Sequence, residues 1–278
     1  MEQSKLQALR EAARQIRIGV IKSTNAAKSG HPGGSLSIAD ILAYLYFEEM
    51  NIDPANPAMP ERDRFVLSKG HCAPGLYSAL ANRGYFPTEE LTTLRKIGAR
   101  LQGHPDMTLT PGVDMSAGSL GLGISSAAGM ALAAKIDKKD YRVYTVVGDG
   151  ESEEGQVWEA CMFASHYKLD NLCVIIDWNG LQIDGPVTEV MNPTPLDEKF
   201  KAFGFNVIVI DGHNFDEIEA AFAAAKECKG KPTAIISKSV KGKGVSFMEN
   251  NVKWHGSAPN AEQYEQAVAE INAFVQSL

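Results

Sequence analysis

The sequence predicts an α/β fold in which helices cover both faces of a parallel sheet. Short β-branched and apolar runs, clearest at residues 142–147 and 172–177, alternate with longer segments of helical periodicity. Strands buried on both faces are continuous apolar runs of this kind, and helical connections keep them parallel. Of the 278 residues, 44% are hydrophobic and 22% are charged, an ordinary globular composition. We therefore expect one domain over residues 1–278, with helical N- and C-terminal extensions.

The N-terminal half is expected to consist mostly of helices and loops. Apolar periodicity predicts an amphipathic helix from about Ser4 to Lys28, and turn residues predict a Gly-rich loop at 29–34. Further along, the pattern predicts a helix at 37–50, a proline-rich loop at 51–60, a strand at 64–67, a helix after His71, a short helix at 88–94 and a loop at 98–118.

The C-terminal half carries the alternation that defines the sheet. A helix rich in small residues is expected from Gly118 to about Ile136. After it we expect strands at 142–147, 172–177, 206–210 and 234–237, and helices at 153–168, 215–228 and 260–274. Right-handed crossovers favour neighbouring positions for consecutive strands, so their carboxyl ends are expected at one edge of the sheet.

Charge and composition exclude several classes of function. The chain has 27 Lys and Arg against 34 Asp and Glu, a net charge of -7, so nucleic acid is not an expected partner. No stretch approaches the roughly 20 apolar residues that cross a bilayer, and the N-terminus has no signal-peptide core, so no membrane contact is expected. The cysteines form no C-x-x-C pair and are expected to be reduced core thiols of a cytoplasmic protein: Cys72, Cys161, Cys173 and Cys228.

Two glycine-flanked polar residues follow neighbouring strands of the predicted sheet. Asp149 lies in Gly-Asp-Gly after the first strand, and Asn179 lies in Asn-Gly-Leu after the second. Open α/β sheets bind ligands at this edge, and glycine lets the backbone approach them. A carboxylate, an amide oxygen and a main-chain carbonyl near Leu181 are hard ligands that suit Mg²⁺ or Ca²⁺ bound to a diphosphate. Taken alone, Gly-Asp-Gly is more often a plain strand-to-helix turn.

Four of the six histidines lie in glycine-flanked loops. They are His31 in SGHPGG, His71 in KGHCAP, His104 in QGHPD and His255 in KWHG. Imidazoles can donate to phosphate, orient hydroxyl groups or transfer protons near neutral pH. A single loop histidine is usually only solvated, but four such loops indicate a polar ligand. His166, expected within a helix, and His213, in a turn, are interpreted as structural.

The motifs together resemble a known family. Residues 151–178, 28 in number, separate Gly150 from Asn179, and this spacing resembles the thiamine diphosphate motif. The segments SGHPGG, LSKGHCAP, QGHPD, SAGSLGLG, GDG…EEG…DWNGLQIDG, DGHN and VKGKGVSFMEN…WHG occur in the order found in the N-terminal domain of transketolases. The resemblance runs from about Ala26 to Gly256. It implies the diphosphate-binding type of the thiamine diphosphate-binding fold.

The resemblance also implies which residues hold the cofactor. Asp149, Asn179 and the carbonyl of Leu181 would coordinate Mg²⁺ or Ca²⁺. Gly150, Lys241 and His255 would hold the diphosphate of thiamine diphosphate. The thiazolium and pyrimidine region would be lined by Gly118, Ser119 and Leu120. Lys241 has the alternative reading of an ordinary solvated lysine, and Lys69 is assigned no role.

Catalytic roles follow from the same resemblance. The residues facing the ketose donor would be His31, His71, His104 and His255. Among them, His31 and His255 would transfer protons, and His71 and His104 would bind substrate hydroxyls. Glu154 would lie at a subunit interface, in contact with the activating glutamate of the partner domain. Its alternative is an ordinary acidic residue in the first turn of a helix.

The expected function is that of the N-terminal subunit of a split transketolase. Because the chain ends at Leu278, soon after the WHG loop, a second chain is expected to supply the pyrimidine-binding and C-terminal domains, in a heterotetramer of two unlike chains. The reaction would move a two-carbon ketol unit from a ketose phosphate to an aldose phosphate. Three alternatives stay open: a split transketolase for an unusual sugar phosphate such as a branched or sulfonated ketose, the α chain of another thiamine diphosphate enzyme such as a 2-oxoacid dehydrogenase, and a non-catalytic domain.

Overall fold

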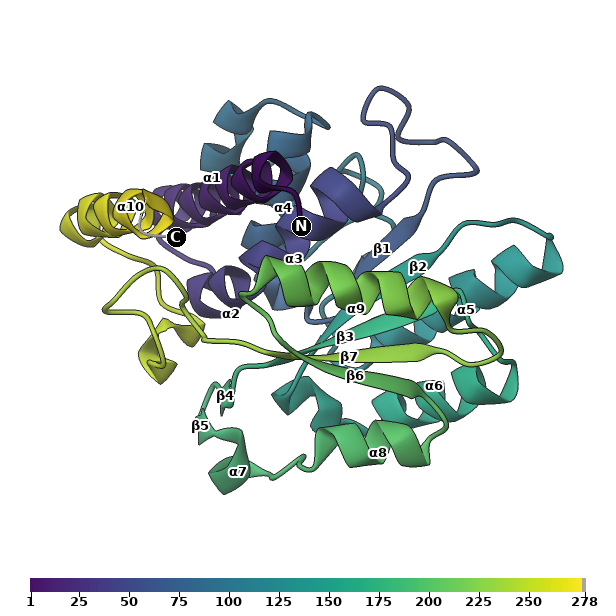
Figure 1. The fold of residues 1–278 in the computed structure, drawn as a ribbon. Helices are drawn as coiled ribbons and strands as arrows, with labels where there is room; N and C mark the ends of the chain where they lie inside the picture. The colour runs from purple at the N-terminus through teal and green to yellow at the C-terminus, as the bar shows by residue number, and fades with distance from the viewer. Residues whose placement is uncertain (277–278) are drawn as a thin grey trace.

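The structure is a computed structural model that describes residues 1–276. Its centre is a five-stranded parallel sheet of order β1-β2-β3-β7-β6, with helices on both faces (Figure 1). The strands are β1 (Arg64–Leu67), β2 (Val143–Gly148), β3 (Leu172–Trp178), β6 (Asn206–Asp211) and β7 (Thr233–Lys238). The α/β fold expected from the sequence is confirmed.

The helices vary from single turns to a helix of 25 residues. They are α1 (Gln3–Ala27), α2 (Pro32–Ser37), α3 (Ala39–Tyr44), α4 (Ala73–Arg83), α5 (Leu122–Ile136), α6 (Gly155–His166), α7 (Val187–Val190), α8 (Leu196–Ala202), α9 (Phe215–Glu227) and α10 (Ala261–Gln276). The chain also has a π turn, η1 (Leu45–Glu49), and the 3-10 turns η2 (Gly70–Cys72), η3 (Thr88–Thr93), η4 (Gly150–Glu153) and η5 (Val252–His255). Among residues 1–276, no helix has both the length and the apolar composition needed to cross a bilayer.

Alternate residues of the strands enter two separate cores, because successive side chains of a strand point to opposite faces. On one face, Phe65 and Ile175 pack with residues of α1, α3, α4 and α9. On the other face, Val66 and Val174 pack with residues of α5, α6 and α8. Figure 1 shows these two layers of helices, with α10 lying beside α1. Helices therefore cover both faces of the sheet.

The Gly-rich segment differs from the expectation. A loop was expected at 29–34, but α2 begins at Pro32, since proline at the start of a helix sacrifices no intrahelical hydrogen bond. Gly33 serves close packing there, because a Cβ would lie 2.8 Å from the carbonyl oxygen of Trp254. The helix expected at 37–50 begins instead at Ala39, because Ile38, with φ -102° and ψ 8°, leaves the helical region and separates α2 from α3.

Three further details correct or complete the sequence-based picture. The small-residue helix starts at Leu122 and not at Gly118, because Gly121 takes the left-handed conformation with φ 81°. Cys228 is partly exposed and so lies outside the core, whereas the other three cysteines are buried, and all four thiols are free. The region after Asn179 contains a small hairpin of β4 (Leu181–Gln182) and β5 (Gly185–Pro186), followed by α7 and α8.

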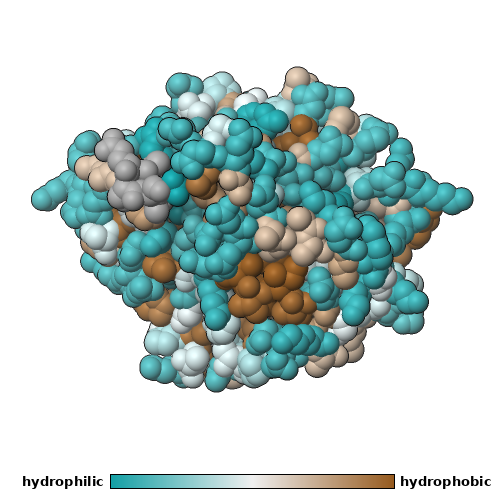
Figure 2. All heavy atoms as spheres, viewed as in Figure 1, coloured by the Kyte–Doolittle hydropathy of each residue, from teal (hydrophilic) through white to brown (hydrophobic). Residues whose placement is uncertain are grey.

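Strand β6 forms one edge of the sheet and is its least covered strand. Val209 is 44% exposed, whereas every residue of β2 is buried. Figure 2 shows an apolar area at the place that β6 occupies in Figure 1, between α8 and α9. Strand β7 separates this edge strand from β3, one of the two strands that the expected polar residues follow.

Candidate functional site

A cavity of about 300 Å³ opens at the carboxyl ends of β2 and β3, which the register brings together by pairing Gly148 with Asp177. The expected site residues that line it are His31, His71, His104, Gly118, Leu120, Asp149, Gly150, Asn179, Leu181, Lys241 and His255. Two expected residues lie elsewhere. Ser119 is exposed in a neighbouring groove, and Glu154 is exposed at the N-terminus of α6. Segments from His31 to His255, far apart in the sequence, thus converge at the carboxyl ends of these strands.

Asp149 is a buried carboxylate that forms no ion pair with any Lys or Arg among residues 1–276. Its Oδ1 accepts a hydrogen bond from the Gly150 N–H at 2.8 Å, and its Oδ2 accepts one from the Gly180 N–H at 2.6 Å. Burial, together with the negative charge of Asp177, raises the pKa of Asp149 to about 6. Ionising this carboxylate at neutral pH costs free energy because it is buried beside another negative charge. A cation bound next to it would offset that cost.

Asn179 and Leu181 present oxygens on the neighbouring strand end. The Asn179 side-chain N–H donates to Asp177 Oδ2 at 2.8 Å, which fixes the orientation of the amide, and its Oδ1 accepts from the Leu181 N–H at 3.1 Å. The Leu181 carbonyl accepts from Lys241 Nζ at 2.7 Å, so this oxygen already faces a positive charge. Lys241 Nζ also lies 3.0 Å from His255 Nδ1. Burial and the positive charge of Lys69 lower the pKa of Lys241.

Three histidines form a compact cluster in the wall of the cavity. The ring centroids of His31 and His71 lie 5.1 Å apart, and those of His71 and His255 also lie 5.1 Å apart. Burial, followed by neighbouring positive charges, lowers the pKa of His31 and His71 to about 4 and that of His255 to about 3. His31 Nδ1 is buried and has no hydrogen-bond partner among residues 1–276. Neutral imidazoles of this kind can both donate to and accept from hydroxyl groups.

The fourth expected histidine, His104, lines the same cavity, and burial lowers its pKa as well. The backbone of Gly118 lies against its ring, because a Cβ on that glycine would be 3.3 Å from the ring carbon Cγ of His104. The other two histidines, His166 and His213, do not line this cavity. The structure therefore gathers the four glycine-flanked histidines and leaves the remaining two outside.

The sequence analysis missed the buried ion pair beneath the cavity. Lys69 Nζ donates to Asp177 Oδ2 at 2.5 Å, and both side chains are at most 2% exposed. Asp177 also accepts from Ser37 Oγ at 2.7 Å and from the hydroxyl of Ser239. Although burial opposes it, the positive charge of Lys69 keeps the pKa of Asp177 below its usual range. The signal that could have found this residue is an aspartate ending an apolar strand.

Glu151 is a second residue that the sequence analysis did not single out. Its Oε1 accepts from Ser68 Oγ at 2.6 Å and from the Gly121 N–H at 2.9 Å, while its Oε2 accepts from the Gly148 N–H at 2.9 Å. Burial raises the pKa of Glu151. This carboxylate ties the start of α5 to the end of β2 and so shapes the floor of the cavity.

Comparison with known proteins places this geometry in a family. Residues 8–272 match the family model described as transketolase, thiamine diphosphate binding domain. A 6-deoxy-6-sulfo-D-fructose transketolase subunit from Clostridium sp. is 50% identical over 95% of this chain and 96% of its own length. An apulose-4-phosphate transketolase subunit from Phocaeicola vulgatus is 45% identical over 91% of this chain and 89% of its own length.

Longer relatives match the same region. Human transketolase is 44% identical over 99% of this chain, which spans 44% of that protein. The crystal structure of transketolase from Campylobacter jejuni superposes with a TM-score of 0.89 at 34% identity, covering 98% of this chain and 43% of that one. The chain therefore spans less than half of these full-length enzymes but nearly all of the two subunits. It belongs to the family of transketolase thiamine diphosphate binding domains.

Proposed function

We propose that the chain is the N-terminal subunit of a split, thiamine diphosphate-dependent transketolase that transfers a two-carbon ketol unit from a ketose phosphate to an aldose phosphate. The observation that carries this proposal is the cavity in which four histidines face Asp149 and Asn179 across one sheet edge. Family membership supplies the cofactor class, and the histidines supply groups suited to sugar hydroxyls. The two relatives matched over nearly their whole length carry the names of transketolase subunits.

The donor set at the sheet edge fits a hard divalent cation. Asp149 offers a carboxylate and Asn179 an amide oxygen, the Leu181 carbonyl is the third oxygen, and no thiol lines the cavity. Among residues 1–276, no three His, Cys, Asp or Glu side chains group with metal-site geometry, so a site here needs amide and carbonyl oxygens as well. We propose Mg²⁺ or Ca²⁺ with the cofactor diphosphate completing its coordination. Lys241 would turn from the Leu181 carbonyl toward the diphosphate, beside Gly150 and His255.

The remaining residues would act on cofactor and substrate. Bound thiamine diphosphate supplies a carbon nucleophile that accepts the ketol unit. Gly118, Ser119 and Leu120 would line its thiazolium and pyrimidine side. His31 and His255, with pKa values lowered to about 4 and about 3, are neutral at pH 7 and so can accept a proton from a hydroxyl. His71 and His104 would bind the substrate hydroxyls.

A partner chain is part of the proposal. The full-length relatives are more than twice as long as this chain, whereas the relatives of matching length are called subunits. The partner would contribute the pyrimidine-binding and C-terminal domains and the glutamate that faces Glu154. Leu120 at 39% and Ile183 at 61% exposure leave an apolar rim on the cavity, which suits a covering chain. A heterotetramer of two unlike chains in the cytoplasm is the assembly we propose.

A second candidate concerns the sugar. The names of the two subunit relatives refer to a sulfonated ketose and to apulose 4-phosphate, so a donor outside the common ketose phosphates is a specific alternative. At 50% and 45% identity, either specificity would need the same cavity histidines with different contacts to the far end of the sugar. The partner subunit would supply many of those contacts.

The experiment compares the chain alone with its complex with the copurifying partner, each supplied with thiamine diphosphate and Mg²⁺. Donors are common ketose phosphates, a sulfonated ketose and a branched ketose phosphate, with an aldose phosphate as acceptor. We expect ketol transfer only by the complex, and an Asn179→Ala complex serves as the inactive control. Robust turnover by the chain alone would contradict the proposal of a split enzyme, and preference for the sulfonated or branched donor would establish the second candidate.

Two outcomes would instead favour other classes of protein. Turnover of pyruvate with a lipoyl acceptor would identify the α chain of a 2-oxoacid dehydrogenase. Failure of the complex to bind thiamine diphosphate at all would identify a non-catalytic domain.

A further inference from the structure

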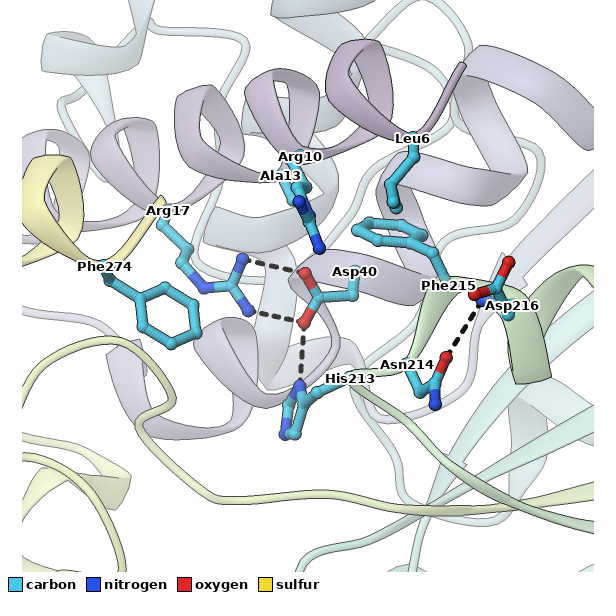
Figure 3. A pocket seen from close by; sticks show the side chains of 10 residues that line it. All are labelled: Leu6, Arg10, Ala13, Arg17, Asp40, His213, Asn214, Phe215, Asp216 and Phe274. Atoms are coloured by element: carbon cyan, nitrogen blue, oxygen red, sulfur yellow. Dashed lines mark hydrogen bonds and ion pairs between the residues drawn. The ribbon is translucent and has the colours of Figure 1, made fainter. Parts of the chain in front are cut away.

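A second buried network lies outside the cofactor cavity, where α1, α3 and the loop before α9 meet. Arg17 Nη1 and Nη2 donate to Asp40 Oδ1 at 2.9 Å and Oδ2 at 2.6 Å, and Asp40 Oδ2 lies 2.7 Å from His213 Nδ1 (Figure 3). The three side chains are 1%, 7% and 13% exposed. Although burial alone would raise it, the charge of Arg17 and the contact with His213 hold the pKa of Asp40 well below its usual range.

The hydrogen bonds of His213 fix which ring nitrogen carries the proton. The Val240 N–H donates to His213 Nε2 at 2.9 Å, so Nε2 accepts through its lone pair and carries no proton. The proton of the neutral ring then lies on Nδ1 and is donated to Asp40. Both ring nitrogens are therefore used, one toward the ion pair and the other toward the backbone that follows β7.

Both ends of this network hold the same short segment. His213 receives the Val240 N–H, and Arg17 Nε donates to the Lys243 carbonyl at 3.2 Å. Lys241 lies between these two anchored residues, and its Nζ extends to the Leu181 carbonyl in the cofactor cavity. The Arg17–Asp40–His213 network thus brackets the lysine from both sides along the chain.

The loop that carries His213 is itself packed tightly against β7. The Gly212 N–H donates to the Lys238 carbonyl at 2.7 Å, and a Cβ at Gly212 would lie 2.2 Å from Ser237 Oγ. A side chain at position 212 would require the Ser237 hydroxyl or the loop to move, so glycine suits this close approach. The backbone that carries His213 is therefore held in place, and the tautomer of its ring is fixed as well.

We propose that His213, held by Asp40 and Arg17, is a positioning residue that fixes residues 240–243 and so sets the reach of Lys241 into the cofactor cavity. This inference rests on the proposed function in one respect, the contact of Lys241 with the cofactor diphosphate. A lysine side chain has many rotamers, so its placement depends on a backbone that does not move. Loss of the hydrogen bonds to Val240 and Lys243 would lower cofactor affinity without removing any group that touches the cofactor.

The test compares two substitutions at one position in the chain bound to its partner subunit. His213→Gln can keep an acceptor near the Nε2 position for the Val240 N–H, whereas His213→Asn can keep only a donor near Nδ1 for Asp40. We expect His213→Asn to speed amide hydrogen exchange of residues 240–243 by about three- to tenfold, the factor that corresponds to one lost hydrogen bond. Thiamine diphosphate affinity in the presence of Mg²⁺, measured by calorimetry, should fall by a similar factor, while kcat at saturating cofactor stays close to the unsubstituted value. His213→Gln should recover part of both losses.

Two controls separate positioning from general destabilisation. His166→Asn makes the same chemical change at an exposed histidine on α6, and Asn171→Ala removes a 2.9 Å hydrogen bond to the Ala131 carbonyl before β3. Neither should change exchange of residues 240–243 or cofactor affinity.

The experiments distinguish the role of the Arg17–Asp40–His213 network from the role of Lys241. Unchanged exchange in His213→Asn would overturn the positioning role. Faster exchange with unchanged cofactor affinity would also overturn it if Lys241→Ala weakens cofactor binding. Lys241→Ala tests the proposed function separately. If that variant binds the cofactor normally while His213→Asn still speeds exchange of residues 240–243, the proposed diphosphate contact of Lys241 is wrong. The Arg17–Asp40–His213 network would still fix this segment.

Discussion

Two aspartates end neighbouring strands of the sheet and have opposite surroundings. Asp177, at the end of β3, binds Lys69, Ser37, Ser239 and Asn179, and its pKa lies below the usual range. Within the described part of the chain, the carboxylate of Asp149, just after β2, accepts hydrogen bonds only from main-chain N–H groups, and its pKa is raised to about 6. Both carboxylates are buried. The difference is whether the positive charge is supplied by the chain or must come from a ligand.

This contrast separates support from function. A buried charge that is fully paired keeps a strand end in one arrangement, and removing its partner is costly. A buried charge that is left unpaired weakens the free protein and gains only when a cation binds. Substitutions at the two strand ends test whether this difference holds.

The largest effect is expected from Asp177→Ala. The substitution leaves the Lys69 ammonium buried without its counter-ion, so the free energy of unfolding should fall by about 3–5 kcal/mol. Urea unfolding of the free chain measures it. A loss below about 1 kcal/mol would show that Lys69 finds other partners and that the β3 end is not a rigid support.

Asp149→Asn should separate binding from stability. Mg²⁺-dependent thiamine diphosphate affinity of the complex should fall by about 100-fold, or about 2.7 kcal/mol, because a charged ligand is lost. The ionised form of Asp149 is disfavoured in the folded chain, a cost fully present above pH 6 and absent below the unfolded pKa. The free chain should therefore gain about 1 kcal/mol at pH 7.5, after one lost hydrogen bond is subtracted. Destabilisation of the free chain would contradict the contrast.

A pH effect is expected from the imidazoles that line the cavity at the two strand ends. The pKa of His71 is about 4 in the folded chain, mainly through burial, so the unfolded chain binds the proton first as pH falls through about 6.5. Stability should therefore fall from pH 7 to pH 5 and continue falling until the folded pKa is reached. His71→Asn should reduce that fall by about 1–2 kcal/mol. Equal pH slopes for the two proteins would argue against a neutral His71.

The smallest effect is expected from Ser37→Ala. Asp177 keeps Lys69, Ser239 and Asn179 when this hydroxyl is removed, so unfolding should become easier by only about 1 kcal/mol. Ser4→Ala, which removes an exposed hydroxyl bound to Glu2, is the matched control and should change nothing measurable. A loss as large as that of Asp177→Ala would mean that the network fails as a unit.

Short stretches of sequence were enough to predict the strands and the glycine-flanked motifs, because both depend on neighbouring residues. The apolar runs predicted the strands of the sheet, and the glycine-flanked motifs marked residues that the structure collects in one cavity. Lys69 and Asp177 were not predicted as a pair, because they are 108 positions apart and only tertiary packing joins them. The same holds for His213, which was expected to be structural on the basis of a turn, without any sign of its contact with Val240. Pro32 shows the limit for local structure, since glycines around it suggested a loop where close packing favours a helix.

The sheet order has a consequence for the chain while it is still being synthesised. Strand β6 precedes β7 in the sequence, yet β7 lies between β3 and β6 in the sheet. A nascent chain that has not yet added Thr233–Lys238 has no neighbour for β6, and β3 lacks its partner on that side. Ribosomal stalling or proteolytic cutting before that point would expose free edges on both β3 and β6, on which strands of other chains can add. Aggregation risk is therefore concentrated in the short interval before the last strand emerges.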